Sequence, residues 1–148
     1  MANGTNHQKS SSYGVGREVE VRVCKLLRSL GWDAILSPGS RGPADISARK
    51  RKDKWCVQVK FREEINSAFI EKGEWRRLAK HSKRFNCLPV ISTVFKVPGN
   101  LMMNSNYFRD KKNPKIIRDS FGVFIGADLD DGYFAFFHNL LDGTCVVP

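Results

Sequence analysis

The chain has 148 residues, of which 41% are hydrophobic and 27% charged, so it is long enough for one folded domain and too short for two ordinary ones. Its 25 Lys and Arg residues against 15 Asp and Glu residues give a formal net charge of +10, which favours a polyanionic partner, with nucleic acid first. No apolar run approaches the roughly 18 residues of a membrane-spanning helix, and no signal peptide precedes the fold, so we expect a soluble, cytoplasmic protein.

The first segments of the chain are a polar stretch and a helix. Residues 1–12 are polar and contain a Ser-Ser-Ser run, which predicts a flexible tail, and residues 13–148 are expected to form one domain. From Tyr13 onward apolar residues recur at helical spacing, and Gly31 supplies the stop signal. The residues on this apolar stripe are Val19, Val23, Leu26, Leu27 and Leu30.

Three strand-like segments follow, at residues 33–37, 44–48 and 55–62. A turn-rich stretch over residues 38–43 separates the first two, and the basic cluster 49–53 connects the second to the third. We interpret this cluster as a solvated hairpin turn in preference to a dedicated DNA contact. The third segment alternates most regularly, with Trp55, Val57, Val59 and Phe61 on a core face and Cys56, Gln58, Lys60 and Arg62 on a polar face.

The second half of the chain predicts a helix that ends near Asn86, a strand over residues 88–97 and a polar loop over 100–114. The helix has Trp75, Leu78, Ala79, Ser82 and Phe85 on one side, and we expect Trp75 and Phe85 to lie in the core. Two further strands, 121–129 and 133–138, flank the hairpin signal Asp130-Asp131-Gly132. This order of elements predicts an α/β fold in which helices flank a mixed central β-sheet.

The cysteines and histidines of the chain do not form a metal-binding motif. Cys24, Cys56, Cys87 and Cys145 stand far apart, without the close pairs of a zinc site or the density of a disulfide scaffold. Buried thiols are therefore the simplest interpretation of the four cysteines, and the three histidines are equally scattered. Any metal should be bound by oxygen atoms.

Four polar residues could meet if these elements pack as predicted. Glu20 lies beside the apolar stripe of the first helix, and Asp45 begins the second strand. Gln58 and Lys60 share the polar face of the third strand, and adjacent strands place such groups within a few ångströms of each other. Two carboxylates and an amide oxygen are ligands suited to Mg²⁺ or Mn²⁺.

These residues, together with their neighbours, resemble a known family. The pattern consists of Gly16-x-x-x-Glu20, Gly31-Trp32, Gly39-Ser40, Asp45, Gln58-Val59-Lys60, Arg77-Leu78, Ser82-Lys83-Arg84-Phe85 and Leu88-Pro89-Val90. It is similar to the archaeal Holliday junction resolvases of the PD-(D/E)XK nuclease superfamily, and the similarity spans about residues 14–97. The resemblance implies a restriction endonuclease-like core and a metal-dependent DNA endonuclease that cleaves phosphodiester bonds in branched DNA.

The resemblance also assigns roles to residues. It implies a catalytic set of Glu20, Asp45, Gln58 and Lys60, in which the first three hold Mg²⁺ or Mn²⁺ and Lys60 orients the attacking water or stabilises charge on the phosphate. The backbone carbonyl of Val59 is a further expected metal ligand. We expect DNA contacts from Ser40, Arg41, Arg62, Arg76, Arg77 and Lys80. A homodimer, with two symmetric sites, is also expected.

Two departures from the family pattern keep other interpretations open. The family commonly has Glu where this chain has Gln58, and it tends to have Arg at the positions of Val21 and Leu36. A neutral Gln58 should lower metal affinity, so a weakened or inactive DNA-binding relative is one alternative. A PD-(D/E)XK nuclease with a different DNA substrate is another. Ser40 and Arg41 are equally compatible with phosphate binding and with an ordinary turn.

Overall fold

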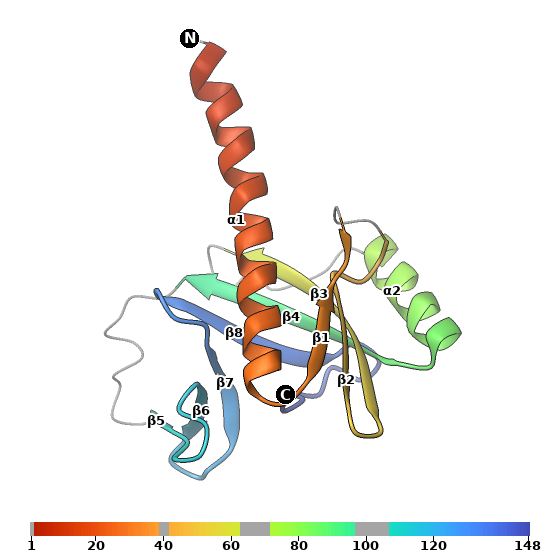
Figure 1. Ribbon diagram of the computed structural model, residues 1–148, viewed down its shortest axis with the longest axis vertical. Helices are drawn as coiled ribbons and strands as arrows, with labels where there is room; N and C mark the ends of the chain where they lie inside the picture. The colour runs from red at the N-terminus through yellow and green to blue at the C-terminus, as the bar shows by residue number, and fades with distance from the viewer. Residues whose placement is uncertain (1, 39–41, 63–71, 97–106) are drawn as a thin grey trace.

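The fold is built on one mixed β-sheet. The computed structural model describes residues 2–38, 42–62, 72–96 and 107–148. Along the chain the elements are α1 (Ala2–Ser29), β1 (Asp33–Leu36), β2 (Ile46–Lys50), β3 (Asp53–Arg62), α2 (Lys72–Phe85), β4 (Leu88–Lys96), β5 (Tyr107–Arg109), β6 (Ile116–Asp119), β7 (Phe124–Asp128) and β8 (Tyr133–Asn139). The eight strands run in the order β1-β2-β3-β4-β8-β7-β6-β5 (Figure 1). Strands β3 and β4 are parallel and the other neighbouring pairs are antiparallel, so the predicted mixed α/β fold is confirmed.

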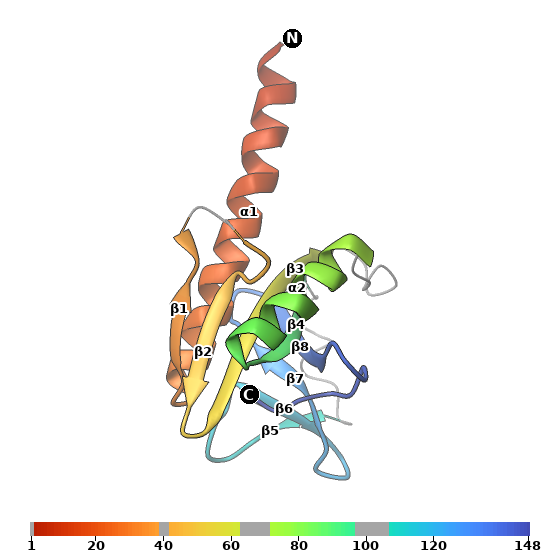
Figure 2. The same cartoon turned by 90° about the vertical axis from the view of Figure 1, so that its right-hand side faces the viewer.

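The two helices lie on opposite faces of the sheet, and the alternation of β3 explains why. Trp55, Val57 and Val59 point into the larger core, which α1 covers, whereas Cys56 points to the other side and packs in a smaller cluster with Leu78 of α2. Figure 2 shows β2 and β3 between α1 and α2. The smaller cluster contains few residues, so α2 rests on the sheet over a short apolar contact.

Helix α1 begins much earlier than the sequence predicts. The sequence predicts a helix only from Tyr13 onward, but α1 starts at Ala2 and projects away from the sheet (Figure 1). Once a helix is nucleated, each added residue gains one backbone hydrogen bond for one ordered residue, so a packed helix extends more readily than an isolated one forms. The other end agrees with the prediction, because α1 stops at Ser29 and Gly31 follows with a φ of 96°, the left-handed conformation that favours glycine.

The prediction that Trp75 and Phe85 belong to the core is wrong. Trp75 is 39% exposed and Phe85 is 54% exposed, whereas Leu78 and Ser82 face the sheet and are buried. The short apolar contact of α2 reaches only its middle, so aromatic residues near its two ends overhang the sheet. Phe85 instead contacts the ring of His81 at 4.6 Å between centroids.

The cysteines divide into two groups. Cys24 and Cys56 are buried as expected, but Cys87 is half-buried and Cys145 is exposed, so the expectation of four buried thiols is only half right. Cys145 lies in the C-terminal segment beyond β8, where its backbone forms an isolated bridge to His138 of β8. Cys56 is the first residue of the face of β3 that was predicted to be polar, and its burial makes the start of that face apolar.

The C-terminal half of the sheet contains two strands that the sequence does not predict. Residues 107–109 and 116–119 form β5 and β6, whereas residues 121–123 precede β7 instead of belonging to it, and Phe121 is 90% exposed. The hairpin at Asp130-Asp131-Gly132 is confirmed, since all three residues have positive φ between β7 and β8. Within the described part of the chain, no helix is long and apolar enough to cross a lipid bilayer.

Candidate functional site

Glu20 enters the site from α1. Its position on the helix follows the apolar stripe, so the residue is 9% exposed and lies at the boundary of the larger core. Arg17, one helical turn earlier, places its Nη1 atom 3.1 Å from Glu20 Oε2 and 3.4 Å from the Ser37 carbonyl oxygen. Arg17 is not predicted from the sequence, although its i, i+3 spacing to Glu20 could have suggested the pair.

Asp45 is held by hydrogen bonds to Ser37, just after β1, and to two residues of β3. Ser37 donates its N–H to the Asp45 carbonyl at 2.8 Å and its hydroxyl to the Ala44 carbonyl at 2.7 Å, which closes the loop that joins β1 to β2. The Asp45 N–H donates to Val57 at 2.8 Å, and Asp45 Oδ2 accepts the Val59 N–H at 2.8 Å. The carboxylate is therefore held against β3 one residue before β2 begins.

Glu20 and Lys60 both act electrostatically on Asp45. Burial raises the pKa of Asp45 from 3.8 to about 6, and the Glu20 carboxylate adds to this rise by repulsion and hydrogen bonding. The Val59 N–H and the Lys60 ammonium act in the opposite direction, because both favour the charged form. The structure thus brings two carboxylates and one ammonium group together at the junction of α1, β2 and β3.

Gln58 and Lys60 occupy the face of β3 on which α2 lies. Lys60 Nζ is 2.7 Å from Glu74 Oε1 in the first turn of α2, and both side chains are largely buried, at 19% and 26% exposed. Gln58 Oε1 is buried, and no group in the described part of the chain donates a hydrogen bond to it. Sequence reasoning missed Glu74, because no periodicity or spacing links it to β3.

The donor set of this site fits a hard divalent cation. A buried pair of carboxylates is unfavourable without a compensating positive charge, and Mg²⁺ and Mn²⁺ prefer carboxylate and amide oxygens. Gln58 Oε1 is a buried acceptor without a hydrogen-bond donor in the described residues, so a bound cation could supply its missing partner. In the ranges that the structure describes, no group of three or more His, Cys, Asp or Glu side chains could hold a metal, so Glu20 and Asp45 would need other oxygen ligands.

The predicted DNA-contacting residues lie on two parts of the molecule. Arg76, Arg77 and Lys80 are exposed on α2, the helix that also carries Glu74. Arg62 lies at the end of β3, where its Nη1 donates to the Phe61 carbonyl at 3.0 Å. Ser40 and Arg41 fall outside the described residues.

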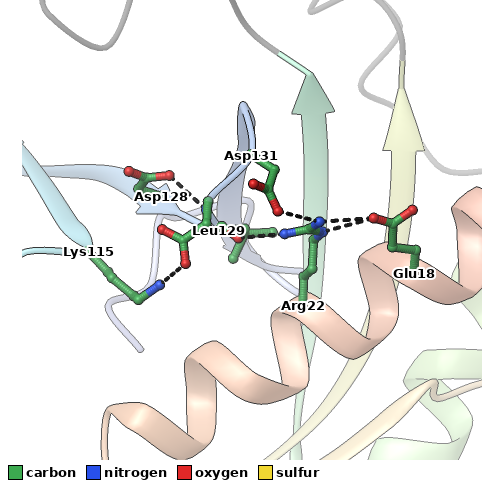
Figure 3. Close-up of polar contacts among 7 residues, drawn as sticks. Glu18, Arg22, Lys115, Asp128, Leu129 and Asp131 are labelled. Atoms are coloured by element: carbon green, nitrogen blue, oxygen red, sulfur yellow. Dashed lines mark hydrogen bonds and ion pairs between the residues drawn. The ribbon is translucent and has the colours of Figure 1, made fainter. Parts of the chain in front are cut away.

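A second polar cluster holds α1 in place. Arg22 donates to Glu18 Oε1 at 2.9 Å, to Asp131 Oδ2 at 2.7 Å and to the Leu129 carbonyl at 3.1 Å, which ties α1 to the β7–β8 turn (Figure 3). Lys115 pairs with Asp130 beside it. We call these residues, Glu18, Arg22, Lys115, Leu129, Asp130 and Asp131, the α1 anchor. Because Glu18 and Glu20 are two residues apart on the helix, one faces the anchor and the other faces the site.

Comparisons with known proteins agree with this architecture. A family model described as archaeal Holliday junction resolvase (Hjc) matches residues 11–126, which is most of the chain. Among solved structures, Hjc of Archaeoglobus fulgidus, a Holliday junction resolvase from an archaeal hyperthermophile, superposes with a TM-score of 0.50. It is 20% identical, and the match covers 71% of this chain and 87% of that chain, which supports the shared fold. The chain therefore belongs to the archaeal Holliday junction resolvase family, and its function is the nuclease function of that family.

Proposed function

We propose that this resolvase is an endonuclease that depends on Mg²⁺ or Mn²⁺ and uses Glu20, Asp45, Gln58 and Lys60 as its catalytic set. Glu20, Asp45, the Gln58 side chain and the Val59 carbonyl would hold the cation. The observation that carries this proposal is that Asp45 is buried beside Glu20: burial, together with the Glu20 carboxylate, raises the pKa of Asp45 to about 6. Such a pair is poised to bind a cation and is costly without one.

The residues of the chain divide the work of phosphodiester hydrolysis. When bound, a divalent cation stabilises the charge that develops on the phosphoryl oxygens and makes water a better nucleophile. Asp45, fixed by the Val59 N–H, and Glu20, held by Arg17, offer carboxylates in place before substrate arrives. Lys60 supplies a positive charge that stabilises the phosphate in the transition state or orients the attacking water.

The substrate of this activity is proposed to be a four-way junction or another branched DNA, bound chiefly through phosphates. The exposed basic residues Arg76, Arg77 and Lys80 lie on the helix that covers the Lys60 side of β3. Basic side chains next to a phosphodiester-cleaving site would steer the backbone toward it. Arg62, at the end of β3, would extend this surface.

A homodimer would present two such sites to opposed strands of a junction, because a twofold axis makes them equivalent. The surface that fits a second copy is the one around Ile35 and Phe85, which are 61% and 54% exposed. They line a groove of about 480 Å³ with His81 and Cys87 between β1–β3 and the end of α2. Phe85→Glu should shift a dimer to a monomer in light scattering if this surface forms the interface, and an unchanged mass would exclude it.

The direct test is cleavage of a labelled four-way junction in Mg²⁺ and in Mn²⁺ by the wild-type chain and by Asp45→Asn. We expect wild-type cleavage, its loss in Asp45→Asn, and unchanged behaviour of Asp53→Asn, which alters an exposed carboxylate at the β2–β3 turn. Junction binding without cleavage in either metal would favour the inactive DNA-binding relative. Faster cleavage of linear duplex or single-stranded DNA would discard the branched substrate.

A further inference from the structure

The ion pair between Lys60 and Glu74 joins the site to helix α2. The two charged atoms are 2.7 Å apart, and both side chains are mostly withdrawn from solvent. A charge-assisted hydrogen bond of this length in a partly buried place fixes the rotamers of both partners. Lys60 has a long, flexible stem, so the position of its ammonium group depends on what holds it.

Lys60 lies between two carboxylates. Its charge lowers the pKa of Asp45 on one side, and Glu74 accepts its hydrogen bond on the other. Without Glu74, the ammonium group would be free to turn toward Asp45 and compete with a cation for that carboxylate. Gln58, which shares this face of β3, is neutral and cannot hold Lys60 by charge.

We propose that Glu74 is a positioning residue for the nuclease reaction: it anchors Lys60 and supplies the negative charge that Gln58 does not provide. This inference rests on the proposed function, since it assumes that Lys60 and Asp45 act in cleavage. Glu74 acts through Lys60 and not as a ligand, because its Oε1 accepts the hydrogen bond of Lys60 Nζ at 2.7 Å.

A purely structural role for Glu74 makes a different prediction. An acidic residue in the first turn of a helix stabilises that helix through the helix dipole, so Glu74 could serve only α2. In that case, placing a carboxylate elsewhere on the face of β3 that carries Lys60 would not restore the cleavage lost with Glu74. Residues at i and i+2 of a strand point to the same face, so a carboxylate at position 58 would lie on the same side of β3 as Lys60.

The test therefore moves the carboxylate from one position to the other. Glu74→Gln keeps the shape of the side chain, and Gln58→Glu/Glu74→Gln returns one negative charge to the same face of β3. We expect Glu74→Gln to slow junction cleavage by about 10- to 100-fold, the range for losing a residue that orients a ligand. The double variant should recover cleavage to within a few-fold of wild type, and the control Asp53→Asn should match wild type.

A second readout does not depend on activity. Calorimetric titration of the DNA-free protein with MnCl₂ should show weaker binding by Glu74→Gln, because an unpaired Lys60 repels the cation. The double variant should bind Mn²⁺ at least as tightly as wild type. Thermal unfolding of the metal-free variants identifies any loss that comes from α2 alone.

The outcomes separate the two proposals. If Asp45→Asn abolishes cleavage but Glu74→Gln cleaves and binds Mn²⁺ as wild type does, the role of Glu74 is overturned and the proposed function stands. A double variant as impaired as Glu74→Gln in both assays would also overturn it, since charge at the site would not matter. If wild type neither cleaves nor binds Mn²⁺, both proposals fail.

Discussion

The candidate site and the α1 anchor use the same kinds of side chain and reach opposite electrostatic results. In the anchor, hydrogen bonds to Glu18 and then Asp131 raise the pKa of Arg22, so each charged group stabilises the charge of its partner. In the site, burial and Glu20 raise the pKa of Asp45, so the charged form of the carboxyl is disfavoured. Both clusters start from α1.

The two clusters also differ in how completely their polar groups are paired. The anchor is complete as folded, because Arg22 finds two carboxylates and the Leu129 carbonyl. The site is incomplete, since burial and the Glu20 carboxylate disfavour the charged form of Asp45, and Gln58 Oε1 has no hydrogen-bond donor in the described residues. Unsatisfied buried groups of this kind are typical of binding and catalytic sites.

The largest expected effect separates two glutamates on one helix. Glu20→Gln removes a proposed cation ligand and should lower junction cleavage by more than about 100-fold, beyond the range seen when a supporting group is lost. Glu18→Gln, two residues away, alters the anchor and should keep cleavage within about twofold. Single-turnover cleavage of a four-way junction at saturating metal measures both. Equal losses in the two variants would erase the contrast between the regions.

The charged Asp45 carboxylate should lower the free energy of unfolding of the metal-free protein. The pKa of Asp45 is about 6 in the folded chain, against an ordinary value of 3.8 for an aspartate carboxyl, so the folded chain holds this proton more tightly than the unfolded chain. Wild-type stability should therefore fall between about pH 4 and 6 and then level off. Asp45→Asn removes this fall and should be more stable above pH 6, by about 1–3 kcal/mol.

Urea unfolding at pH 4 and pH 7 in the presence of a chelator measures this difference. The Asn side chain can still accept the Val59 N–H, so the backbone contact is kept. Equal stability of Asp45→Asn and wild type at pH 7 would show that the carboxylates are not strained. Added Mg²⁺ should stabilise wild type and leave Asp45→Asn nearly unchanged.

The α1 anchor, unlike the site, should add to the stability of the folded protein. Arg22→Ala removes the two hydrogen bonds that join α1 to Leu129 and Asp131 of the β7–β8 turn, together with the pairing to Glu18 within α1, and should destabilise the protein by about 1–2 kcal/mol at neutral pH. Lys115→Ala breaks an exposed pair and should cost under about 0.5 kcal/mol. Chemical denaturation gives both values. If Arg22→Ala also abolished cleavage at saturating metal in folded protein, the anchor would be part of the site.

The smallest effect concerns DNA binding by α2. Arg77→Gln removes one proposed phosphate contact and should weaken junction binding a few-fold, with a salt slope lower by about one. Fluorescence anisotropy at several salt concentrations measures the slope. Lys111→Gln, in the turn between β5 and β6, is the matched control and should leave the slope as it is. An identical slope for Arg77→Gln would remove this residue from the interface.

The sequence predicts the parts of this fold that periodicity controls. The alternation of β3 and the stripe of α1 identify their core faces, because each pattern spans most of its element. Strands β5 and β6 have three and four residues, too short to show a period. Residues 2–12 have no apolar stripe, so their place in α1 follows from extension of the helix and not from their own pattern.

The candidate site also contains residues that the sequence predicts and residues that it does not. Glu20, Asp45, Gln58 and Lys60 could be chosen from the sequence because their order resembles a family motif. Arg17 and Glu74 could not be chosen as firmly, since their roles arise when α1 meets the β1–β2 loop and α2 meets β3.

The proposed cation site can be located directly by the anomalous signal of Mn²⁺ in a crystal of the wild-type chain. We expect a peak at about 2.0–2.3 Å from carboxylate oxygens of both Glu20 and Asp45. A well-occupied Mn²⁺ elsewhere, with these two carboxylates in contact only with protein, would contradict it.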